Sequence, residues 1–378
     1  REVVIVDGCR SAVGKKDGAL TNIRSDDLLA IILKELINRT KVPMELVDDV
    51  IVGTVTQTKE QAMNIARDAL LMAGFATHVP GVTIDRQCGS SQQAVHFGAQ
   101  AILAGDMDIV IAGGVESMTR SPMFSNVGGT KPSKRLAEKY EIVNQGIAAE
   151  KIAEKWGLSR EKLDEYSLRS HEKAIQAIRK GFYEKEIVPI TIGENVFKTD
   201  EGPRENTSLE ALSNLRPVFK EDGLITAGNA SQMSDGASAV LLMERKKAEE
   251  LGLKPKAKIL TRVVVGSDPT LMLTGPIEAT KRALERANLS IDEIDLFEVN
   301  EAFAPVPLAY LAETKADEEK LNVNGGAIAP GHPLGATGTK LLTSLMYELE
   351  RTNGKYGLLA ICEGMGMANA TIIERIDS

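Results

Sequence analysis

Two of the three cysteines lie in short segments that could present a thiol for chemistry. Cys88 follows an apolar run at residues 82–84 and precedes a helical pattern that starts at Ser91. A helix N-terminus carries partial positive charge, which lowers the pKa of a nearby thiol and favours the nucleophilic thiolate. Cys362 ends a second apolar run, 358–361, beside glycines whose N–H groups can face a ligand. We therefore expect Cys88 to be a nucleophile, with a buried structural cysteine as the alternative.

His332 is the one histidine that stands in a glycine-rich loop. Residues 324–338 contain five glycines, and His332 lies between Gly331 and Pro333. Because proline fixes its own φ, the ring is held on a stiff backbone. The loop precedes a helical pattern and could bind phosphate, but its glycines lack the spacing of a nucleotide-binding P-loop. We predict a reactive role for His332 and structural roles for the remaining histidines, His78, His96 and His171.

Asn300 and Glu301 follow an apolar run at residues 294–299 and precede a helical pattern. Polar side chains at the end of a strand, where a helix begins, suit the rim of an active site. An asparagine in that position can equally well cap the helix by accepting a hydrogen bond from a backbone N–H. Asn300 is therefore a candidate site residue, with helix capping as the alternative.

Apolar runs and helical patterns alternate along most of the chain, which is typical of an α/β fold. The runs are apolar throughout or nearly so, and this indicates strands that are buried on both faces. We expect strands at residues 3–6, 50–55, 82–84, 109–112, 239–242, 294–299 and 358–361. We expect helices at residues 25–38, 63–73, 91–104 and 338–350.

The two ends of the chain show the same order of features, which favours an internal duplication. In each, a strand is followed by a loop with a reactive residue, a long helix and a strand that runs into glycines. Residues 116–228 break this rhythm with charged helical stretches and Gly/Pro turns, as an inserted, mostly helical subdomain would. The expected division is residues 1–115 and 229–250 for the first half, 116–228 for the insertion and 251–378 for the second half.

Composition excludes several classes of protein. Of 378 residues, 45 are Lys or Arg and 53 are Asp or Glu, so the formal net charge is −8 and argues against nucleic-acid binding. The widely spaced cysteines form no C-x-x-C pair, and no H-E-x-x-H motif is present, which argues against disulfides and a zinc site. No apolar run reaches the roughly 18 residues of a membrane span, and no signal-peptide pattern is seen. We therefore expect a cytoplasmic protein.

Taken together, these segments closely resemble the thiolase family in order and spacing over essentially the whole chain. The matching motifs are at residues 9–15, 83–91, 113–118, 226–236, 300–303, 325–338 and 362–366. The resemblance implies the α/β thiolase fold: two duplicated βαβαβαββ halves in a five-layered αβαβα core with an inserted loop domain. It also implies an enzyme that cleaves 3-ketoacyl-CoA by thiolysis or runs the reverse Claisen condensation.

The resemblance further implies a role for each reactive residue. Cys88 would carry the acyl group as a thioester in a ping-pong reaction, and His332 would take the proton of the Cys88 thiol. Cys362 would move the proton to and from the α-carbon of the acetyl unit. Asn300, through a water, would form one oxyanion hole with His332. The backbone N–H groups of Cys88 and Gly364 would form the other.

Coenzyme A would be a substrate, and no metal or other cofactor is expected. The resemblance places Ser231 near the pantetheine arm and Arg204 near the nucleotide phosphates, with Ala230 and Met118 also at the substrate. It implies a homodimer, with a dimer of dimers as a further option. Neither a nucleic acid nor a membrane span is expected.

Two departures from the commonest family pattern bear on the substrate. Gly89-Ser90-Ser91 follows Cys88 in place of the usual Ser-Ser-Gly, as in a bacterial branch that includes steroid-side-chain thiolases. Asn144-Gln145-Gly146 replaces the His-Met-Gly of short-chain biosynthetic enzymes. We therefore expect a degradative, β-oxidation type of thiolase acting on longer or bulkier acyl groups. The alternatives are a biosynthetic acetoacetyl-CoA thiolase, a ketoacyl synthase and a non-catalytic lipid-binding protein.

Overall fold

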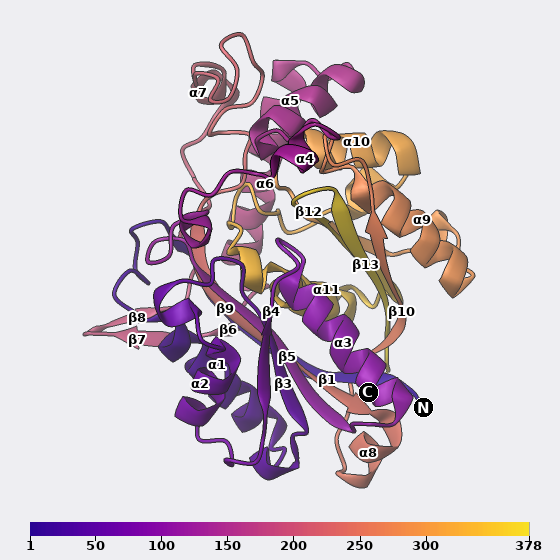
Figure 1. Cartoon of the computed structure of the whole chain (residues 1–378). Coiled ribbons are helices and arrows are strands. Elements are labelled where there is room, and N and C mark those ends of the chain that lie inside the picture. Colours follow the sequence, from indigo (N-terminus) through magenta and orange to yellow (C-terminus); the bar gives the residue numbers. More distant parts are fainter. Residues whose placement is uncertain (378) are drawn as a thin grey trace.

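One long mixed sheet runs through the computed structural model, which describes residues 1–377 (Figure 1). From edge to edge its strands are β11 (Leu296–Val299), β12 (Tyr356–Glu363), β13 (Met367–Arg375), β10 (Ala257–Gly266), β1 (Val3–Ser11), β9 (Ser234–Glu244), β5 (Ile109–Ser117), β3 (Asp49–Gly53) and β4 (Gly81–Ile84). Two short strands pair beside this path, β2 (Gly14–Lys15) with β9 and β6 (Ile187–Val188) with β1.

The junction between β1 and β10 divides this sheet into two similar halves. These strands are aligned only at Val4 with Lys258 and Ile5 with Ala257. In one half, β1, β9 and β5 are antiparallel neighbours and β5 is parallel to β3. In the other half, β10, β13 and β12 are antiparallel neighbours and β12 is parallel to β11. The strand directions therefore repeat, as a duplicated chain predicts.

Helices cover both halves and also fill the space between them, which makes five layers (Figure 1). The middle layer is α3 (Ser90–Ala104) with α11 (Thr337–Thr352), which contact each other. Helix α3 packs mainly on the first half of the sheet, whereas α11 contacts strands of both halves. The outer layers are α1 (Ser25–Thr40) with α2 (Ile65–Ala73), and α9 (Gly275–Ala287) with α10 (Pro305–Thr314). The short helix α8 (Arg245–Glu250) follows β9.

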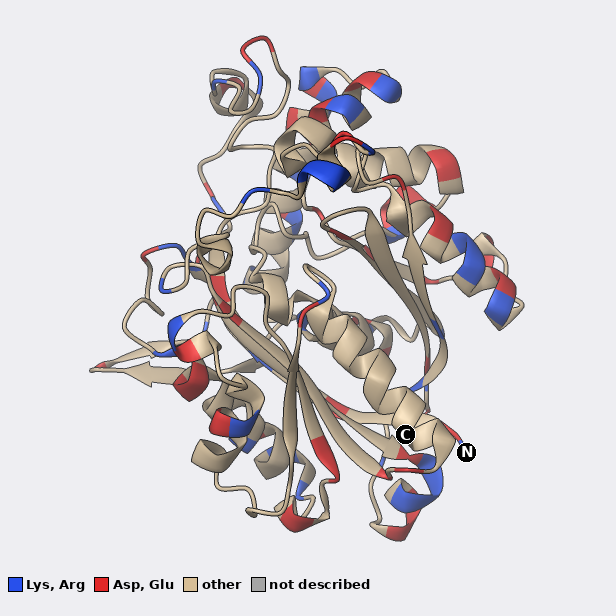
Figure 2. Ribbon diagram, viewed as in Figure 1, with Lys and Arg blue, Asp and Glu red and all other residues tan. Residues whose placement is uncertain are grey.

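The composition of α3 suits a helix that has protein on nearly every side. It contains no charged residue, and Figure 2 shows its ribbon free of charge while the outer helix α9 carries both signs. Gly98 of α3 faces Val110 and Leu242 on the sheet, and Ala94, Val95 and Ile102 are buried in one apolar cluster with both halves. Small and apolar residues thus let the helix lie close to the sheet.

The segment between β5 and β9 forms helices and a small hairpin over the core. Its elements are α4 (Lys134–Ala137), α5 (Gln145–Lys155), α6 (Arg160–Arg179), β7 (Ile190–Ile192), β8 (Asn195–Phe197) and α7 (Leu209–Ser213). Apolar residues of α5 and α6 are buried against α10 and against residues 302–304, which precede that helix. The strand β5 runs on to Ser117, so its last two residues lie within the expected insertion, 116–228.

The expected α/β fold and all of the expected strands and helices are confirmed, with ends that shift by a few residues. Two long strands, β10 and β13, escaped the sequence analysis. In β10, buried residues alternate with half-buried or exposed ones, and the polar residues Lys258, Thr261 and Arg262 interrupt its apolar residues. In β13, the buried positions include Asn369 and Thr371, polar residues whose burial depends on partners elsewhere in the chain.

The N-termini of α3 and α11 meet at very short range in the middle layer. The backbone N–H of Thr339 donates to Oγ of Ser91 at 3.0 Å. At Gly338, a Cβ would overlap the backbone nitrogen of Gln92, so only glycine fits without moving a helix. This contact brings together the loop before α3 and the loop before α11.

We predict that Gly338→Ala lowers the free energy of unfolding by about 1–3 kcal/mol, although alanine favours helices. The added Cβ would push α11 away from the backbone of α3. Urea denaturation measures the effect. Gly266→Ala is the matched control, because no atom lies within 4 Å of its Cβ position. Equal stability of the two variants would contradict the close packing.

Candidate active site

Cys88 stands in a tight turn at the N-terminus of α3. The preceding residue, Gln87, has a left-handed backbone with φ of 49°, a costly conformation for a non-glycine residue. The turn is held by the N–H of Gly89, which donates to the carbonyl of Arg86 at 3.1 Å, and by the N–H of Gln87, which donates to Asp85 at 2.7 Å. The constrained turn fixes where the Cys88 thiol points.

Burial governs the ionisation of Cys88. The sequence analysis predicted that the helix N-terminus would lower the pKa of this thiol, and that prediction is wrong, because the pKa is raised. Gly89 does cap α3, but burial raises the pKa of the Cys88 thiol well above its ordinary value, and the nearby Cys362 and Glu363 raise it further. A thiolate is therefore disfavoured at neutral pH. The nucleophile needs a base that removes its proton.

The His332 loop is anchored by its backbone. The N–H of His332 donates to Oγ of Ser234 at 3.1 Å. The preceding Gly331 has φ of 105°, and a Cβ there would overlap that same Oγ. Glycine is thus required for the turn that aims the ring.

The hydrogen bonds of the His332 ring define which nitrogen is free to accept a proton. Nδ1 lies 2.7 Å from Oγ1 of Thr337, and this hydroxyl lies 2.9 Å from the carbonyl of Pro333. The carbonyl can only accept, so Thr337 donates to it and accepts from Nδ1–H. Nε2 then carries the lone pair, and Nδ2 of Asn300 lies 3.4 Å from it. Burial, with Lys340, lowers the pKa of His332 to about 3, so the ring is neutral and can act as a base.

Asn300 and Cys362 are brought together by two adjacent parallel strands. β11 ends at Val299 and pairs with β12, and the N–H of Asn300 continues that pairing to the carbonyl of Ala360 at 3.1 Å. Cys362 is two residues farther along β12 and is fully buried. Burial raises the pKa of its thiol to about 12, so it rests with its proton in place.

Glu116, which the sequence analysis left without a role, ties the His332 loop to the first half. Its carboxylate accepts backbone N–H bonds from Val55 at 2.9 Å, Thr56 at 3.0 Å and Gly335 at 2.9 Å. The side chain of Gln61 donates a fourth bond at 2.9 Å. The available signal was a lone carboxylate in an otherwise apolar, glycine-containing strand.

Glu301 is a second buried carboxylate that joins separate segments through hydrogen bonds. It accepts bonds from the hydroxyls of Tyr166 at 2.8 Å and Ser170 at 2.7 Å on α6, and from the N–H of Ile328 at 3.1 Å. Asn300 faces the His332 ring, whereas Glu301 joins the insertion to the loop that carries His332. Asn300 is therefore a residue of the candidate site, and Glu301 supports the position of the His332 loop.

A cavity of about 150 Å³ lies beside Cys88. It is lined by Val55, Thr56, Gln87, Cys88, Met123, Phe124, Asn126, Val127, Gln145 and Leu334. Four of these side chains carry amide or hydroxyl groups, and apart from the Cys88 thiol the rest are apolar. Met118 is not among the lining residues, and its side chain is buried in the same apolar cluster as Cys88.

A second hollow of about 150 Å³ includes Arg204. The backbone N–H of Arg204 donates to Nδ1 of His171 at 3.1 Å, and the side chain is exposed. Ala230 and Ser231 lie close by in sequence to lining residues of this hollow, and the N–H of Ser231 donates to the carbonyl of Ala302 at 3.0 Å. An exposed arginine at the mouth of a groove is suited to bind an anion.

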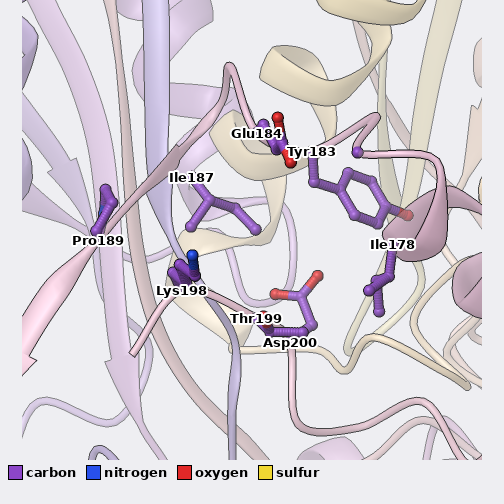
Figure 3. Close-up of a pocket in the computed structure, with 9 residues that line it drawn as sticks. Ile178, Tyr183, Glu184, Ile187, Pro189, Lys198, Thr199 and Asp200 are labelled. Atoms are coloured by element: carbon purple, nitrogen blue, oxygen red, sulfur yellow. The ribbon is translucent and has the colours of Figure 1, made fainter. Parts of the chain in front are cut away.

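Another cavity, of about 280 Å³, contains none of the reactive residues (Figure 3). Figure 3 shows Asp200 and the ring of Tyr183 at its wall. The Asp200 carboxylate is engaged by the guanidinium of Arg10 at 2.7 Å and by the N–H of Val13 at 2.7 Å. The hydroxyl of Tyr183 donates to the carbonyl of Asn324 at 2.5 Å. These groups are already paired and support the fold.

Two further findings concern residues 1–377. Within this range, no helix combines the length and apolarity needed to cross a bilayer. The same residues contain no cluster of three or more His, Cys, Asp or Glu side chains placed to hold a metal ion.

A thiol in a constrained turn, a neutral imidazole and a second thiol belong to the chemistry of cysteine-dependent acyl transfer. Family comparison agrees with this class. The thiolase N-terminal domain matches residues 3–246, and the thiolase C-terminal domain matches residues 253–375. The chain is an enzyme of the thiolase family.

Individual relatives cover the chain almost completely. A steroid 3-ketoacyl-CoA thiolase, FadA6, of Mycobacterium tuberculosis is 51% identical over 99% of this chain and 94% of its own length. A 3-ketoacyl-CoA thiolase of Bacillus subtilis is 45% identical over 99% of both chains. The crystal structure of the Bacillus anthracis acetyl-CoA acetyltransferase has a TM-score of 0.92, with 40% identity and 99% coverage of both chains. The expected fold and family are thereby confirmed.

We predict that Thr337→Val slows alkylation of Cys88 by iodoacetamide at pH 7 by roughly ten- to a hundredfold. A buried Nδ1–H without an acceptor costs about 1–3 kcal/mol, which favours the tautomer whose Nε2 is already protonated. The ¹⁵N shifts of the His332 side chain report the tautomer directly, and Thr337→Ser should restore both readouts.

Thr343→Val is the matched control for this variant. Thr343 is also buried in α11 and bonds the carbonyl four residues earlier, at 2.8 Å, but it does not contact His332. If Thr337→Val and Thr343→Val changed the alkylation rate equally, the tautomer role of Thr337 would be refuted.

Proposed function

We propose that this enzyme catalyses CoA-dependent thiolytic cleavage of 3-ketoacyl-CoA to acetyl-CoA and a shortened acyl-CoA, through an acyl thioester on Cys88. The observation that carries the proposal is a neutral His332 whose Nε2 faces the Asn300 amide at 3.4 Å, in the loop that packs on the Cys88 helix. A base next to a hydrogen-bond donor, on a loop joined to the helix of the proposed nucleophile, supports this proposal.

The first half-reaction moves one proton at each thiol. Nε2 of His332 takes the proton of Cys88, and the sulfur attacks the 3-keto carbon. The resulting imidazolium donates a hydrogen bond to the oxyanion from Nε2–H, and this stabilises the charge that develops there. The bond between C2 and C3 then breaks, and Cys362 gives its proton to C2, so acetyl-CoA leaves.

The second half-reaction restores both thiols. A new CoA thiol gives its proton to the Cys362 thiolate and attacks the carbonyl of the acyl-Cys88 thioester. The Cys88 sulfur leaves and recovers its proton from His332 as the shortened acyl-CoA departs. The N–H groups of Cys88 and Gly364 are proposed to bind the thioester oxygen in these steps.

The groove that includes Arg204 is the proposed site of coenzyme A. Its apolar lining suits the pantetheine arm, and the exposed guanidinium suits the phosphates. Ser231 and Ala230 lie in the loop that meets the start of α10 and are proposed to contact the arm. Met118 acts, on this view, by supporting the wall behind Cys88 rather than by touching the substrate.

A degradative role fits the acyl side of the site. Two of the relatives have names that describe 3-ketoacyl-CoA thiolases, one of them for steroids. Gln145 lines the Cys88 cavity, in the position where the resemblance expects methionine for short-chain biosynthetic enzymes. Biosynthetic condensation of two acetyl-CoA is the second candidate, because an acetyl-CoA acetyltransferase of Syntrophomonas wolfei is 42% identical over all of both chains.

A homodimer is proposed from the free edge of the sheet at β4. This strand ends the strand order, and Val82 on it is 40% exposed. Met63 and Phe97, in the flanking segments, are 90% and 41% exposed. An exposed strand edge beside apolar side chains is a natural pairing surface for a second copy.

We predict that Cys362→Ala still forms an acyl-Cys88 thioester from acyl-CoA but fails to exchange the α-protons of acetyl-CoA with solvent. The thiol that carries the proton to and from C2 would be absent, while the nucleophile and its base remain. Mass spectrometry of the acyl-enzyme and NMR of acetyl-CoA in D₂O measure the two steps. Normal exchange in this variant would remove the acid–base role of Cys362.

Thiolysis rates across a series of 3-ketoacyl-CoA lengths test the degradative assignment. We expect kcat/KM to rise from four carbons to longer or bulkier chains. Gln145→Met, which restores the short-chain residue type, should shift the preference toward four carbons. A sharp optimum at acetoacetyl-CoA in the unmodified enzyme would favour the biosynthetic alternative.

A further inference from the structure

Glu363 is a buried carboxyl group that the proposed reaction does not use. It is the last residue of β12, directly after Cys362, and its exposed fraction is 0%. Within the described residues, neither Oε1 nor Oε2 has a hydrogen-bond partner. A buried carboxyl without partners is costly, so its retention beside a reactive thiol calls for an explanation.

The carboxyl group lies against the turn that carries the nucleophile. A Cβ added at Gly89 would overlap Oε1 of Glu363, with the carboxyl carbon at 2.7 Å and Cγ at 3.1 Å. Gly89 has φ of −90°, so its backbone does not itself require glycine. A side chain at this position, where the commonest thiolase pattern has serine, would therefore displace the Glu363 carboxyl group from the place it occupies.

We propose that Glu363 controls thiolate formation at Cys88 and Cys362 through its own charge, and that Gly89 and Glu363 form a matched pair. Glu363 acts on the reaction through the two thiols, so it is a positioning residue. The proposal rests on the proposed function, because it assumes that both cysteines ionise during turnover.

The surroundings of Glu363 keep its proton on at neutral pH. Burial raises the pKa of Glu363 to about 8, while Arg86 lowers it and Asp85 raises it. The other titratable groups that face it are the two thiols, and Glu363 raises the pKa of Cys362 and of Cys88. The Arg86 guanidinium lies nearer to the sulfur of Met367, at 3.7 Å, and forms no ion pair with Glu363.

The sign of the effect depends on pH. Below about pH 8, Glu363 is neutral and adds no charge that opposes a thiolate. Above that pH, Glu363 becomes a carboxylate, and repulsion raises the free energy of a thiolate at either cysteine. The rate at which the thiols react therefore rises less steeply with pH above about pH 8 than it would without the Glu363 carboxylate.

Glu363→Gln tests this effect, because glutamine keeps the shape and cannot ionise. Iodoacetamide labelling of Cys88 and Cys362, followed separately by peptide mass spectrometry, gives the two rates. We expect Cys88 of Glu363→Gln to react about tenfold faster than the unmodified protein at pH 9.5, for a shift of one pKa unit, and within about twofold at pH 6.5.

Asp85→Asn is the matched control for the loss of a negative charge on the same turn. Asparagine keeps the oxygen that accepts from Gln87, and the ratio of rates should stay near one at both pH values. The proposal is overturned if Glu363→Gln changes the rate equally at pH 6.5 and 9.5, or at neither. If Cys88 fails to label in any variant, the nucleophile assignment fails instead.

A second test uses the packing and does not depend on titration. Gly89→Ser alone should reduce kcat at least tenfold, because the new side chain overlaps the carboxyl group. Glu363→Ala in the same chain should recover most of that loss, since it empties the space. Additive losses in the double variant would show that the two residues are not a matched pair.

Discussion

The close approach of two buried helix N-termini is the constraint on which the site depends. α3 and α11 form the middle layer, and Gly338 lets the backbone of one lie on the backbone of the other. Each helix is preceded by the loop that carries a reactive residue, Cys88 in one half and His332 in the other. The duplicated order of strands places these two helices as counterparts, so the reactive loops meet because the halves pack face to face. A Cβ at Gly338 would push the two helices apart and thereby move the Cys88 loop away from the His332 loop.

Buried carboxyl groups around this contact differ in how they are compensated. Glu116 and Glu301 each accept several hydrogen bonds from segments that are distant in sequence, and these bonds offset part of the cost of burying the carboxylate. They act as clamps. Glu363 has no such bonds and instead keeps a proton, which leaves a titratable group beside two thiols. Three chemically identical side chains thus serve two different purposes, because the surroundings of Glu116 and Glu301 supply hydrogen-bond donors and those of Glu363 do not.

Much of the architecture could be predicted from local patterns. Strands buried on both faces read as apolar runs, and the strand-and-loop order of the two ends indicated a duplication. β10 and β13 could not be found in this way, since their buried positions alternate or include asparagine and threonine. The pKa of Cys88 was predicted in the wrong direction for a related reason. The helix terminus is a local feature that the sequence reveals, whereas burial depends on the layers above and below it.

The sequence by itself determined the α/β class, the family resemblance and the candidates Cys88, Asn300, His332 and Cys362, because residue types and their spacing along one chain carry that information. Only the tertiary structure decided which partner each candidate meets. The tautomer of His332 depends on Thr337, whose hydroxyl the fold of the loop places 2.7 Å from Nδ1 of the ring. The coupling of Glu363 to Gly89 joins residues from opposite halves. Such pairings arise from packing between layers, and packing distances are not encoded in any single segment.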